Sequence, residues 1–331
     1  MIKGLVITPP VLGRISIGKV VEKNGKRLPE KDDQFTLTTQ VQGRDGWLLH
    51  PYDETLRQSA NGKLRKIPVR LMFNDPDLNL RAEYSAFDRN TGRPLCVGNG
   101  ETCKRHVNDA IETLPCPAPE GCAVGKGVCK PYGRLNVIIG EDDELGSFIF
   151  RTTGYNSIRT LAARLRYFQA VSGSRLSCLK LDLKLRAKST TQSHRAPVYY
   201  VDLTVREGMT LEEAVIDATT LKAKRLANGV QQDALEAAAR QGFANGAFEE
   251  SCEEMPEILE EFFNDSGTAR RDGNHATESH PPATTGTTTA TPSGSSRLRE
   301  KLDRQALELT PETVSTLRSM AREVFDSAEL E

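Results

Sequence analysis

Apolar and polar residues alternate along much of the first 95 residues of the chain. The stretches GRISIGKVV, DQFTLTTQV, KIPVRLMF and LNLRAEYSAF show this period of two, which is typical of strands with one buried face. The turn signal NDPD separates the last two stretches. Further along, RLNVIIG and GSFIFRTTG flank the acidic stretch EDDEL and predict a hairpin. We therefore expect a β-rich N-terminal part.

Helical and strand patterns follow one another in the next hundred residues. Apolar residues recur at helical spacing after Asn156, and Thr210 with Glu213 forms the sequence signature of a capping box. Leucines at alternate positions predict a strand before Lys188. We expect helices over residues 156–173, 210–228 and about 230–245, and strands over 176–188 and 196–206. This order indicates an α+β fold with a mixed or antiparallel sheet and packed helices.

The composition changes after residue 248. Residues 249–265 contain eight acidic residues and no basic ones, and residues 266–296 are rich in Thr, Ser, Pro and Gly. Such a segment buries too little apolar surface to offset the entropy of ordering, so we expect disorder. A helical pattern returns near Thr310 and Pro311. The expected organisation is an α+β domain over 1–248 with a Cys-rich segment at 96–130, a linker over 249–296 that is first acidic and then disordered, and a short C-terminal helical segment over 297–331.

Composition favours a protein that works in the cytoplasm. Hydrophobic residues make up 37% of the 331 residues and charged residues 27%, and no apolar run approaches the roughly 18 residues that span a bilayer. The N-terminal stretch is interrupted by Pro9 and Pro10 too early for a signal peptide. We therefore expect no membrane partner.

Five of the seven cysteines fall within 34 residues. In a reducing compartment disulfides are rare, and thiolates flanked by Gly and Pro turns suit a structural zinc site. The sequence predicts one Zn²⁺ bound by four of these five residues: Cys96, Cys103, Cys116, Cys122 and Cys129. Cys96 and Cys103 compete for the fourth position, with His106 as a weaker candidate. No CxxC knuckle is present, and the alternatives are unliganded thiols or an iron–sulfur or redox role.

The segment from Arg151 to Tyr200 is basic. It holds ten Lys or Arg residues against a single acidic residue, Asp182. A basic strand face beside a polar loop can contact a phosphate backbone, although an ordinary solvated strand face has the same pattern. The candidate nucleic-acid contacts are Arg164, Arg166, Lys180, Lys184, Arg186, Lys188 and Arg195.

Catalytic motifs are absent from the sequence. Asp75 and Asp77 in the NDPD turn and His194 in a polar loop are the residues that a metal-dependent hydrolase could use, but they lack a recognisable motif. We interpret the first pair as a turn and the histidine as part of a loop between strands. The chain is therefore not expected to be an enzyme, and hydrolysis remains the weakest alternative.

The order of several segments resembles a known family. RPLCVGNGETC, LPCPAPEGC, CKPYGRLNVIIG, ELGSFIFRTTGYNSIRTLAARL and KSTTQSHRAPVYYVDL follow one another over about residues 65–210. This order resembles recombination directionality factors, the accessory proteins of large serine integrases in phages, and related "hydrolase or metal-binding" proteins of proteobacterial mobile elements. The resemblance implies a non-enzymatic factor of DNA recombination that binds an integrase, shifts it from integration to excision, and can also touch DNA. The alternative is a nucleic-acid-binding protein of element replication or repair.

Overall fold

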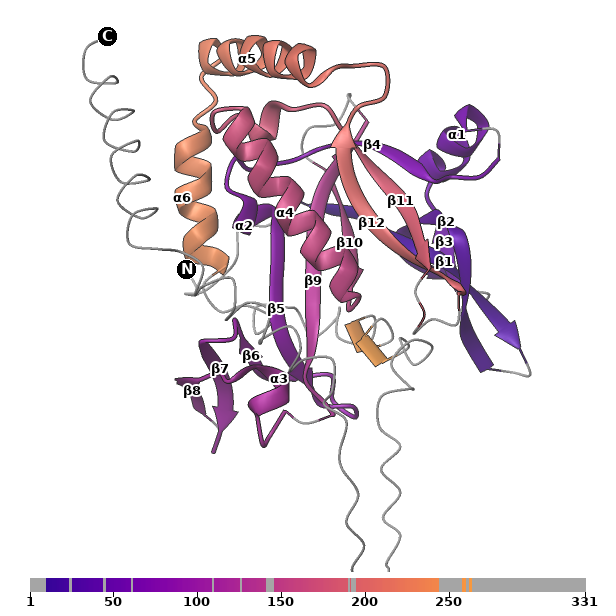
Figure 1. The fold of residues 1–331 in the computed structure, drawn as a ribbon, viewed down its shortest axis with the longest axis vertical. Coiled ribbons are helices and arrows are strands. Elements are labelled where there is room, and N and C mark those ends of the chain that lie inside the picture. The colour runs from indigo at the N-terminus through magenta and orange to yellow at the C-terminus, as the bar shows by residue number, and fades with distance from the viewer. Residues whose placement is uncertain are drawn as a thin grey trace, which may run out of the picture. The chain divides into compact units, whose positions relative to one another are not determined.

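Twelve strands form one connected sheet in the computed structural model, and helices pack against it (Figure 1). The strands are β1 (Val11–Lys23), β2 (Lys26–Gly43), β3 (Gly46–Leu49), β4 (Lys66–Arg70), β5 (Leu80–Phe87), β6 (Pro94–Gly98), β7 (Thr102–Val107), β8 (Ala110–Pro115), β9 (Lys130–Ile139), β10 (Ser147–Thr152), β11 (Leu181–Ser189) and β12 (Pro197–Val205). The helices are α1 (Pro51–Ser59), α2 (Pro76–Asn79), α3 (Ala118–Gly121), α4 (Tyr155–Val171), α5 (Leu211–Ala227) and α6 (Gln232–Gly242), with a 3₁₀ turn η1 (Leu176–Cys178).

The structure describes most of the chain up to residue 243 and two short pieces after it. The described residues are 10–23, 26–43, 46–60, 62–108, 110–125, 127–140, 146–189, 191, 195–243, 258–259 and 262–263. The chain divides into two units, Met1–Gly273 and Asn274–Glu331, and every described residue belongs to the first. The disordered stretch expected at 266–296 and the helical segment expected at 297–331 lie outside the described residues, so both stay predictions.

The sheet is mixed, which confirms the expected α+β class. Its main path runs β3-β2-β1-β10-β9-β5-β6-β7-β8, and β4 joins β9 to the pair β11 and β12. Strands β1 and β10 are parallel, and the other neighbours are antiparallel. The hairpin predicted across EDDEL is present, because Phe148 of β10 pairs with Val137 of β9.

Helix α4 covers one face of the sheet. Its residues Leu161, Leu165 and Phe168 are buried in the main core with alternate residues of β9 and β10, and Ile158 is buried as well. Gly133 allows this close approach, since a Cβ there would lie 2.8 Å from Cγ1 of Ile158. The odd-numbered residues of β9 therefore face α4, and the even-numbered residues face the other side of the sheet.

Helix predictions from capping chemistry agree with the structure. The Thr210 side chain accepts a hydrogen bond from the backbone N–H of Glu213, and the Glu213 side chain accepts one from the N–H of Thr210, so the capping box of α5 is confirmed. The sequence patterns did not predict α1 or strands β6 to β8. Strand β8 is almost wholly exposed, so its residues have no buried face and carry no apolar alternation.

Among the helices that the structure describes, none has the length and apolar character needed to span a lipid bilayer.

Candidate functional site

The five clustered cysteines lie together in the part of the molecule formed by β6 to β8, α3 and the loop that leads into β9. We call residues 94–130 the cysteine module (lower part of Figure 1). Cys96 of β6 pairs with Arg105 of β7, and Cys103 of β7 pairs with Gly98 of β6. The other three follow β8, follow α3 and precede β9: Cys116, Cys122 and Cys129. Residues 33 positions apart in the sequence thus meet in one module.

Two glycines make room for the sulfur atoms. A Cβ at Gly98 would lie 2.6 Å from Cβ of Cys103 and 2.8 Å from Sγ of Cys116. A Cβ at Gly125 would lie 2.9 Å from Cβ of Cys129. The glycines beside the cysteines therefore let the backbone wrap closely around the thiols, as their pattern in the sequence suggested.

The thiols influence one another electrostatically. Burial, followed by the charges of the four other clustered cysteines, raises the pKa of Cys129 to about 12. Burial and a hydrogen bond with Cys96 raise the pKa of Cys103 to about 11. The pKa of Cys122 is lowered instead, first because the backbone N–H of Gly125 donates to its Sγ at 3.3 Å and also because Arg105 lies nearby. A single cation among these groups would favour all their thiolate forms.

The position of His106 makes it a weaker metal-ligand candidate than the clustered cysteines. On β7, Cys103 and Arg105 lie on one face of the strand, and His106 lies on the other face and is exposed. Within the described residues, no three or more His, Cys, Asp or Glu side chains are arranged so as to hold a metal ion. The donor set fits Zn²⁺ in number and in chemistry, and metal coordination itself stays a prediction.

The cysteine module has almost no apolar core of its own. Of its described residues up to Cys129, the buried ones are Pro94, Val97, Gly98, Cys103 and Gly125. Arg105, which sequence reasoning did not single out, reaches into the cluster, and its Nη2 donates to Sγ of Cys122 at 3.5 Å. A segment with so little apolar burial needs another source of order, such as a metal or contacts with the rest of the chain.

Most of the candidate nucleic-acid contacts are engaged within the protein. Arg164 and Arg186 both donate to the carboxylate of Asp202, at 2.9 Å and 2.5 Å. Lys180 pairs with Asp217 at 2.9 Å, and Lys188 donates to the Asn156 amide oxygen at 2.7 Å. Three of these four side chains are therefore paired with carboxylates of the same chain, and Lys188 binds a neutral amide.

The remaining three candidates differ from one another. Arg166 lies 3.8 Å from Asp77, and both side chains are largely exposed. Lys184 is half-buried. Burial raises the pKa of Asp182, and the charge of Lys184 only partly opposes that increase. Arg195 is exposed in the turn before β12 and has a φ of 64°. The structure therefore brings Arg164 and Arg186 together around one buried acid and leaves DNA contact a prediction.

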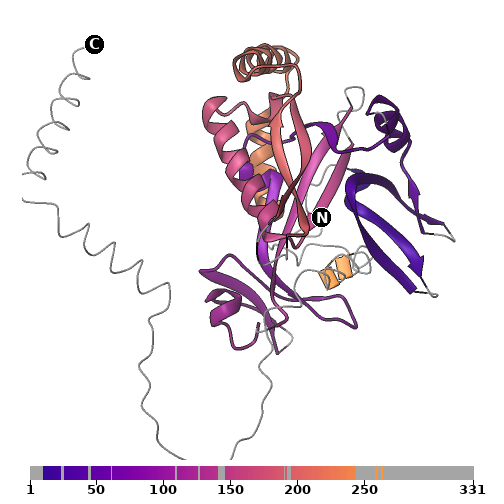
Figure 2. The same cartoon turned by 45° about the vertical axis from the view of Figure 1, so that its right-hand side comes forward.

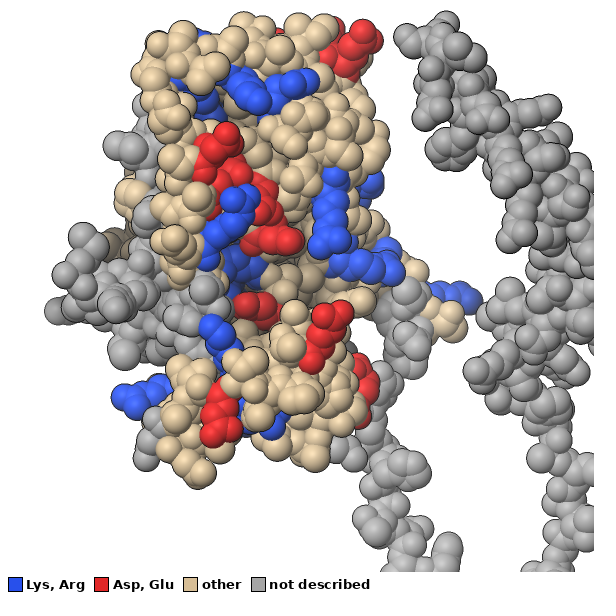
Figure 3. All heavy atoms as spheres, turned by 90° about the vertical axis from the view of Figure 1, so that its left-hand side faces the viewer, with Lys and Arg blue, Asp and Glu red and all other residues tan. Residues whose placement is uncertain are grey.

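Surface charge on the α5 and α6 side is mixed. Figure 3 shows Lys and Arg interspersed with Asp and Glu over the described part of this face. Such a face does not offer the basic field of one sign that attracts a phosphate backbone over a distance.

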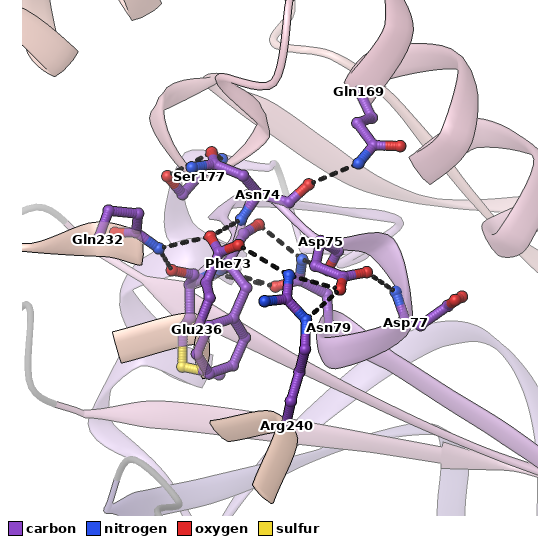
Figure 4. Close-up of polar contacts among 11 residues, drawn as sticks. Phe73, Asn74, Asp75, Asp77, Asn79, Gln169, Ser177, Gln232, Glu236 and Arg240 are labelled. Carbon is purple, nitrogen blue, oxygen red and sulfur yellow. Dashed lines mark hydrogen bonds and ion pairs between the residues drawn. The ribbon is translucent and has the colours of Figure 1, made fainter. Parts of the chain in front are cut away.

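The NDPD stretch is a structural turn, as the sequence indicated. Asp75 caps α2 by accepting a hydrogen bond from the N–H of Asp77, and Arg240 of α6 binds the same carboxylate at 3.0 Å (Figure 4). The N–H of Asn74 donates to the buried carboxylate of Glu236 at 2.6 Å. These contacts fasten the turn to α6.

The hydrolase residues do not form a site in the described part of the chain. Asp75 is occupied by the helix cap and by Arg240, and Asp77 is exposed beside Arg166. His194 lies outside the described residues. The network around Asn74 and Asp75 borders a pocket that Lys222 and Arg225 of α5 also line, but no arrangement of a nucleophile and a base is present among these residues.

Comparison with known proteins identifies the family. No curated protein and no solved structure matches the chain at a significant level. A family model described as Gp3-like, recombination directionality factor-like, matches residues 12–206. That range includes nearly all of the sheet, the cysteine module and α4. The match covers more than half of the 331 residues, and the protein belongs to the recombination directionality factor-like family.

Proposed function

We propose that the protein is an accessory factor of DNA recombination that binds a site-specific recombinase of the large serine integrase type and shifts it from integration to excision. The observation that supports this most is the family match over residues 12–206, because it covers the folded sheet rather than a single motif. The factor acts through protein contact and without catalysis of its own. The use of Asp75 in a helix cap supports the second point.

Protein contact is favoured over DNA contact by the internal charge pairs. Arg164, Arg186 and Lys180 already bind acidic side chains of the same chain. Releasing Arg164 and Arg186 toward phosphate would leave the buried Asp202 without these counter-charges, which is costly. A direct role in single-strand binding therefore ranks second and depends on the exposed Arg195 and its neighbours.

A recombination assay tests this function. Purified integrase of the same element is mixed with attachment-site pairs for integration and for excision, with and without this protein. We expect the protein to inhibit integration, to stimulate excision and to co-elute with the integrase. An unchanged ratio of the two reactions together with no complex would contradict the proposal. Salt-dependent DNA binding by the protein alone would instead support the second function, a nucleic-acid-binding protein of element replication or repair.

We further propose that four of Cys96, Cys103, Cys116, Cys122 and Cys129 bind one Zn²⁺ as a structural ion. Support comes from the convergence of five thiols in a module that buries few apolar residues. Such an ion stabilises the folded module, because ligand binding at a site that forms only on folding adds to folding stability. Metal analysis of the purified chain should find about one zinc per chain, and a chain with freely titratable thiols and no metal would contradict this.

A further inference from the structure

An apolar pocket lies where strands β5, β6 and β9 run side by side. It is formed by Phe87 of β5, Val97 of β6 and Tyr132 of β9, and each of these side chains is no more than 5% exposed. The rings of Phe87 and Tyr132 meet edge to face, with their centroids 5.6 Å apart. We call these three residues the aromatic pocket. It links the cysteine module, which contains Val97, to the rest of the sheet.

A short helical piece from the C-terminal side of the chain fills this pocket. Ile258 and Phe262 are fully buried against it, and the Phe262 ring lies 4.8 Å from that of Phe87 and 5.9 Å from that of Tyr132. The piece is drawn in orange beside the lower end of the sheet in both ribbon views (Figures 1 and 2). We call its four described residues the plug: Ile258, Leu259, Phe262 and Phe263.

The plug shows what kind of ligand the pocket accepts. Its residues have the spacing i, i+1, i+4 and i+5, which places them on one side of a helix. Apolar side chains with this spacing anchor an amphipathic helix in the groove of a partner protein. The pocket therefore takes the apolar stripe of a helix, with an aromatic ring of that stripe packed between Phe87 and Tyr132.

Two cations at the edge of the pocket add direction and selectivity. Nζ of Lys130 donates to the carbonyl oxygen of Phe262 at 3.2 Å and lies 5.4 Å from the centroid of its ring. The guanidinium carbon of Arg89 lies 4.8 Å from the ring centroid of Phe263. Helical carbonyl groups point toward the C-terminal end of a helix, and cations are attracted to aromatic faces. The pocket therefore favours a helix with aromatic residues near its C-terminal end.

The pocket and the plug stand in different parts of the chain with respect to the family. The family model matches residues 12–206, which include the whole aromatic pocket together with Arg89 and Lys130, whereas the plug lies outside the match. The part of the chain that the family model describes thus contains the pocket without the plug. Without a ligand, two aromatic rings and Val97 would face solvent, and exposed apolar patches of this kind mark contact sites.

The plug is suited to be displaced. The described contact involves four apolar side chains of one short helical piece. A helix of this length does not form by itself in water, so the plug gains its helical order from the pocket and depends on its tether for a high local concentration. A helix that is already formed in a partner protein loses less conformational entropy on binding, so it can compete with the plug.

We propose that the aromatic pocket is the docking site for an amphipathic helix of the recombinase, and that the plug occupies it as an intramolecular mimic until that helix displaces it. This inference rests on the proposed function, which names the recombinase as the partner. The pocket recognises the apolar stripe of the partner helix. The plug is an autoinhibitory contact, because the recombinase binds only when its helix outcompetes a tethered ligand.

Displacement of the plug is measured first without a recombinase. The probe is a fluorescein-labelled peptide of residues 254–266, and the readout is anisotropy. In the wild-type chain the tethered plug competes with the peptide, whereas the full-length variant Ile258→Ala/Phe262→Ala leaves the pocket empty and should bind the peptide at least about tenfold more tightly. The matched control Ile216→Ala/Leu226→Ala changes two exposed apolar residues of α5 and should behave like the wild type. Equal affinity of the emptied variant and the wild type would overturn the inference.

The recombinase then tests the identity of the partner. Integrase of the same element is immobilised, and its affinity for the full-length chains is measured. We expect the emptied variant to bind at least about tenfold more tightly than the wild type, because no plug has to be displaced. Free plug peptide should reduce the complex formed by the wild-type chain, and a peptide with alanine in place of Ile258 and Phe262 should leave that complex intact. The peptide comparison alters no residue of the protein, so it gives an answer even if the emptied variant does not fold.

The inference and the proposed function fail in different ways. A recombinase complex that is equally strong with the wild type and the emptied variant, and that the plug peptide leaves intact, would contradict the inference and leave the proposed function in place. The absence of any complex between the recombinase and either chain would contradict the proposed function, and with it the partner assigned to the aromatic pocket.

Discussion

Asp202 of β12 accepts a hydrogen bond of 2.9 Å from Nε of Arg164 in α4, which ties the helix to the strand pair β11 and β12. Arg186 of β11 binds the other oxygen of the same carboxylate. Burial raises the pKa of Asp202, but the two guanidinium groups outweigh burial and the net pKa is lowered. Asp182, on the same face of the neighbouring strand, shows the opposite result, since burial dominates and raises its pKa.

Replacing Asp202 should destabilise the fold. In Asp202→Asn two cations lose a buried counter-charge, and because both are about half exposed we expect a loss of about 1–3 kcal/mol in the free energy of unfolding at pH 7. The pKa of Asp202 is lowered in the folded state. The stabilisation that ionised Asp202 provides is therefore fully present above the unfolded pKa, which is near 4, and it is lost as the pH falls through the folded pKa. Urea unfolding at pH 7 and pH 3 measures both effects, and an equal loss at both would contradict the assignment.

Asp182→Asn should behave differently and serves as the matched control. The pKa of Asp182 is raised in the folded state. The stability that protonated Asp182 contributes is therefore present below the unfolded pKa and is lost as the pH rises through the folded pKa. At pH 7 the buried charge is unfavourable, and asparagine can still accept the hydrogen bond from the N–H of Glu207. We expect unchanged or slightly higher stability at pH 7 by the same urea measurement, and a loss as large as that of Asp202→Asn would refute this reasoning.

Removing one candidate metal ligand should cost metal and stability together. Cys122→Ser is expected to reduce bound zinc to near zero and to lower the melting temperature, because the module has little apolar burial to replace the ion. Mass spectrometry of the metal content and a thermal melt are the measurements. Cys178→Ser is the control, since Cys178 is the last residue of η1, lies in the main core and is not part of the module. Full zinc occupancy in the Cys122 variant would exclude it as a ligand.

A methyl group at Gly98 should disturb the cysteine module. In Gly98→Ala the new Cβ would approach Sγ of Cys116 at 2.8 Å and the carbonyl oxygen of Thr102 at 2.9 Å, so the strands must separate. We expect a loss of about 1–3 kcal/mol, as for overpacked cores, and weaker zinc retention against a chelator. Gly121→Ala is milder, because its closest contact would be 3.2 Å from Cβ of Pro117. Equal stability of the two variants would show that the crowding is relieved.

Two arginines of the basic segment should separate structural from DNA-binding roles. Arg164→Ala removes a partner of Asp202 and should lower the melting temperature, whereas Arg195→Ala alters an exposed turn residue and should not. If residues 151–200 contact DNA, Arg195→Ala should weaken binding and reduce the slope of log K against log salt by about one. Anisotropy with oligonucleotides at several salt concentrations checks this, and an unchanged slope would remove Arg195 from the interface.

Elements with strong periodicity or capping chemistry were predictable from the sequence. The strand around Leu183, the capping box of Thr210 and Glu213, and the β9–β10 hairpin all appear in the structure. Strand β8 could not be predicted, because it is an exposed strand at the edge of the sheet and needs no apolar alternation. The Gly- and Cys-rich sequence of β6 and β7 likewise carries little apolar alternation. The helix was expected to begin at residue 156, but the N-cap of α4 is Gly154, and the Ser157 hydroxyl accepts a hydrogen bond from the N–H of Val201.

The candidate sites were predicted as sets of residues rather than as geometry. The clustering of the cysteines in the sequence correctly indicated that they lie close together in space, because turns rich in Gly and Pro keep residues that are near in the sequence close together. The basic set was harder to interpret, since Asp202 is sixteen residues from Arg186 and thirty-eight from Arg164 and only the fold brings them together. Phe87, Val97 and Tyr132 are likewise separated in the sequence, and only the fold makes them neighbours.

The parallel pairing of β1 with β10 has a consequence for synthesis. Val11 of β1 is in register with Ser147 of β10. Some 136 further residues must therefore be synthesised after Val11 before β1 can pair with β10. At typical translation rates this takes on the order of ten seconds, during which one edge of the β1–β2 hairpin is unpaired. An open strand edge recruits other chains, so the nascent protein has a period in which a chaperone that covers this hairpin would prevent aggregation. Late sheet closure also predicts slow refolding from denaturant, as expected when contacts join distant parts of a chain.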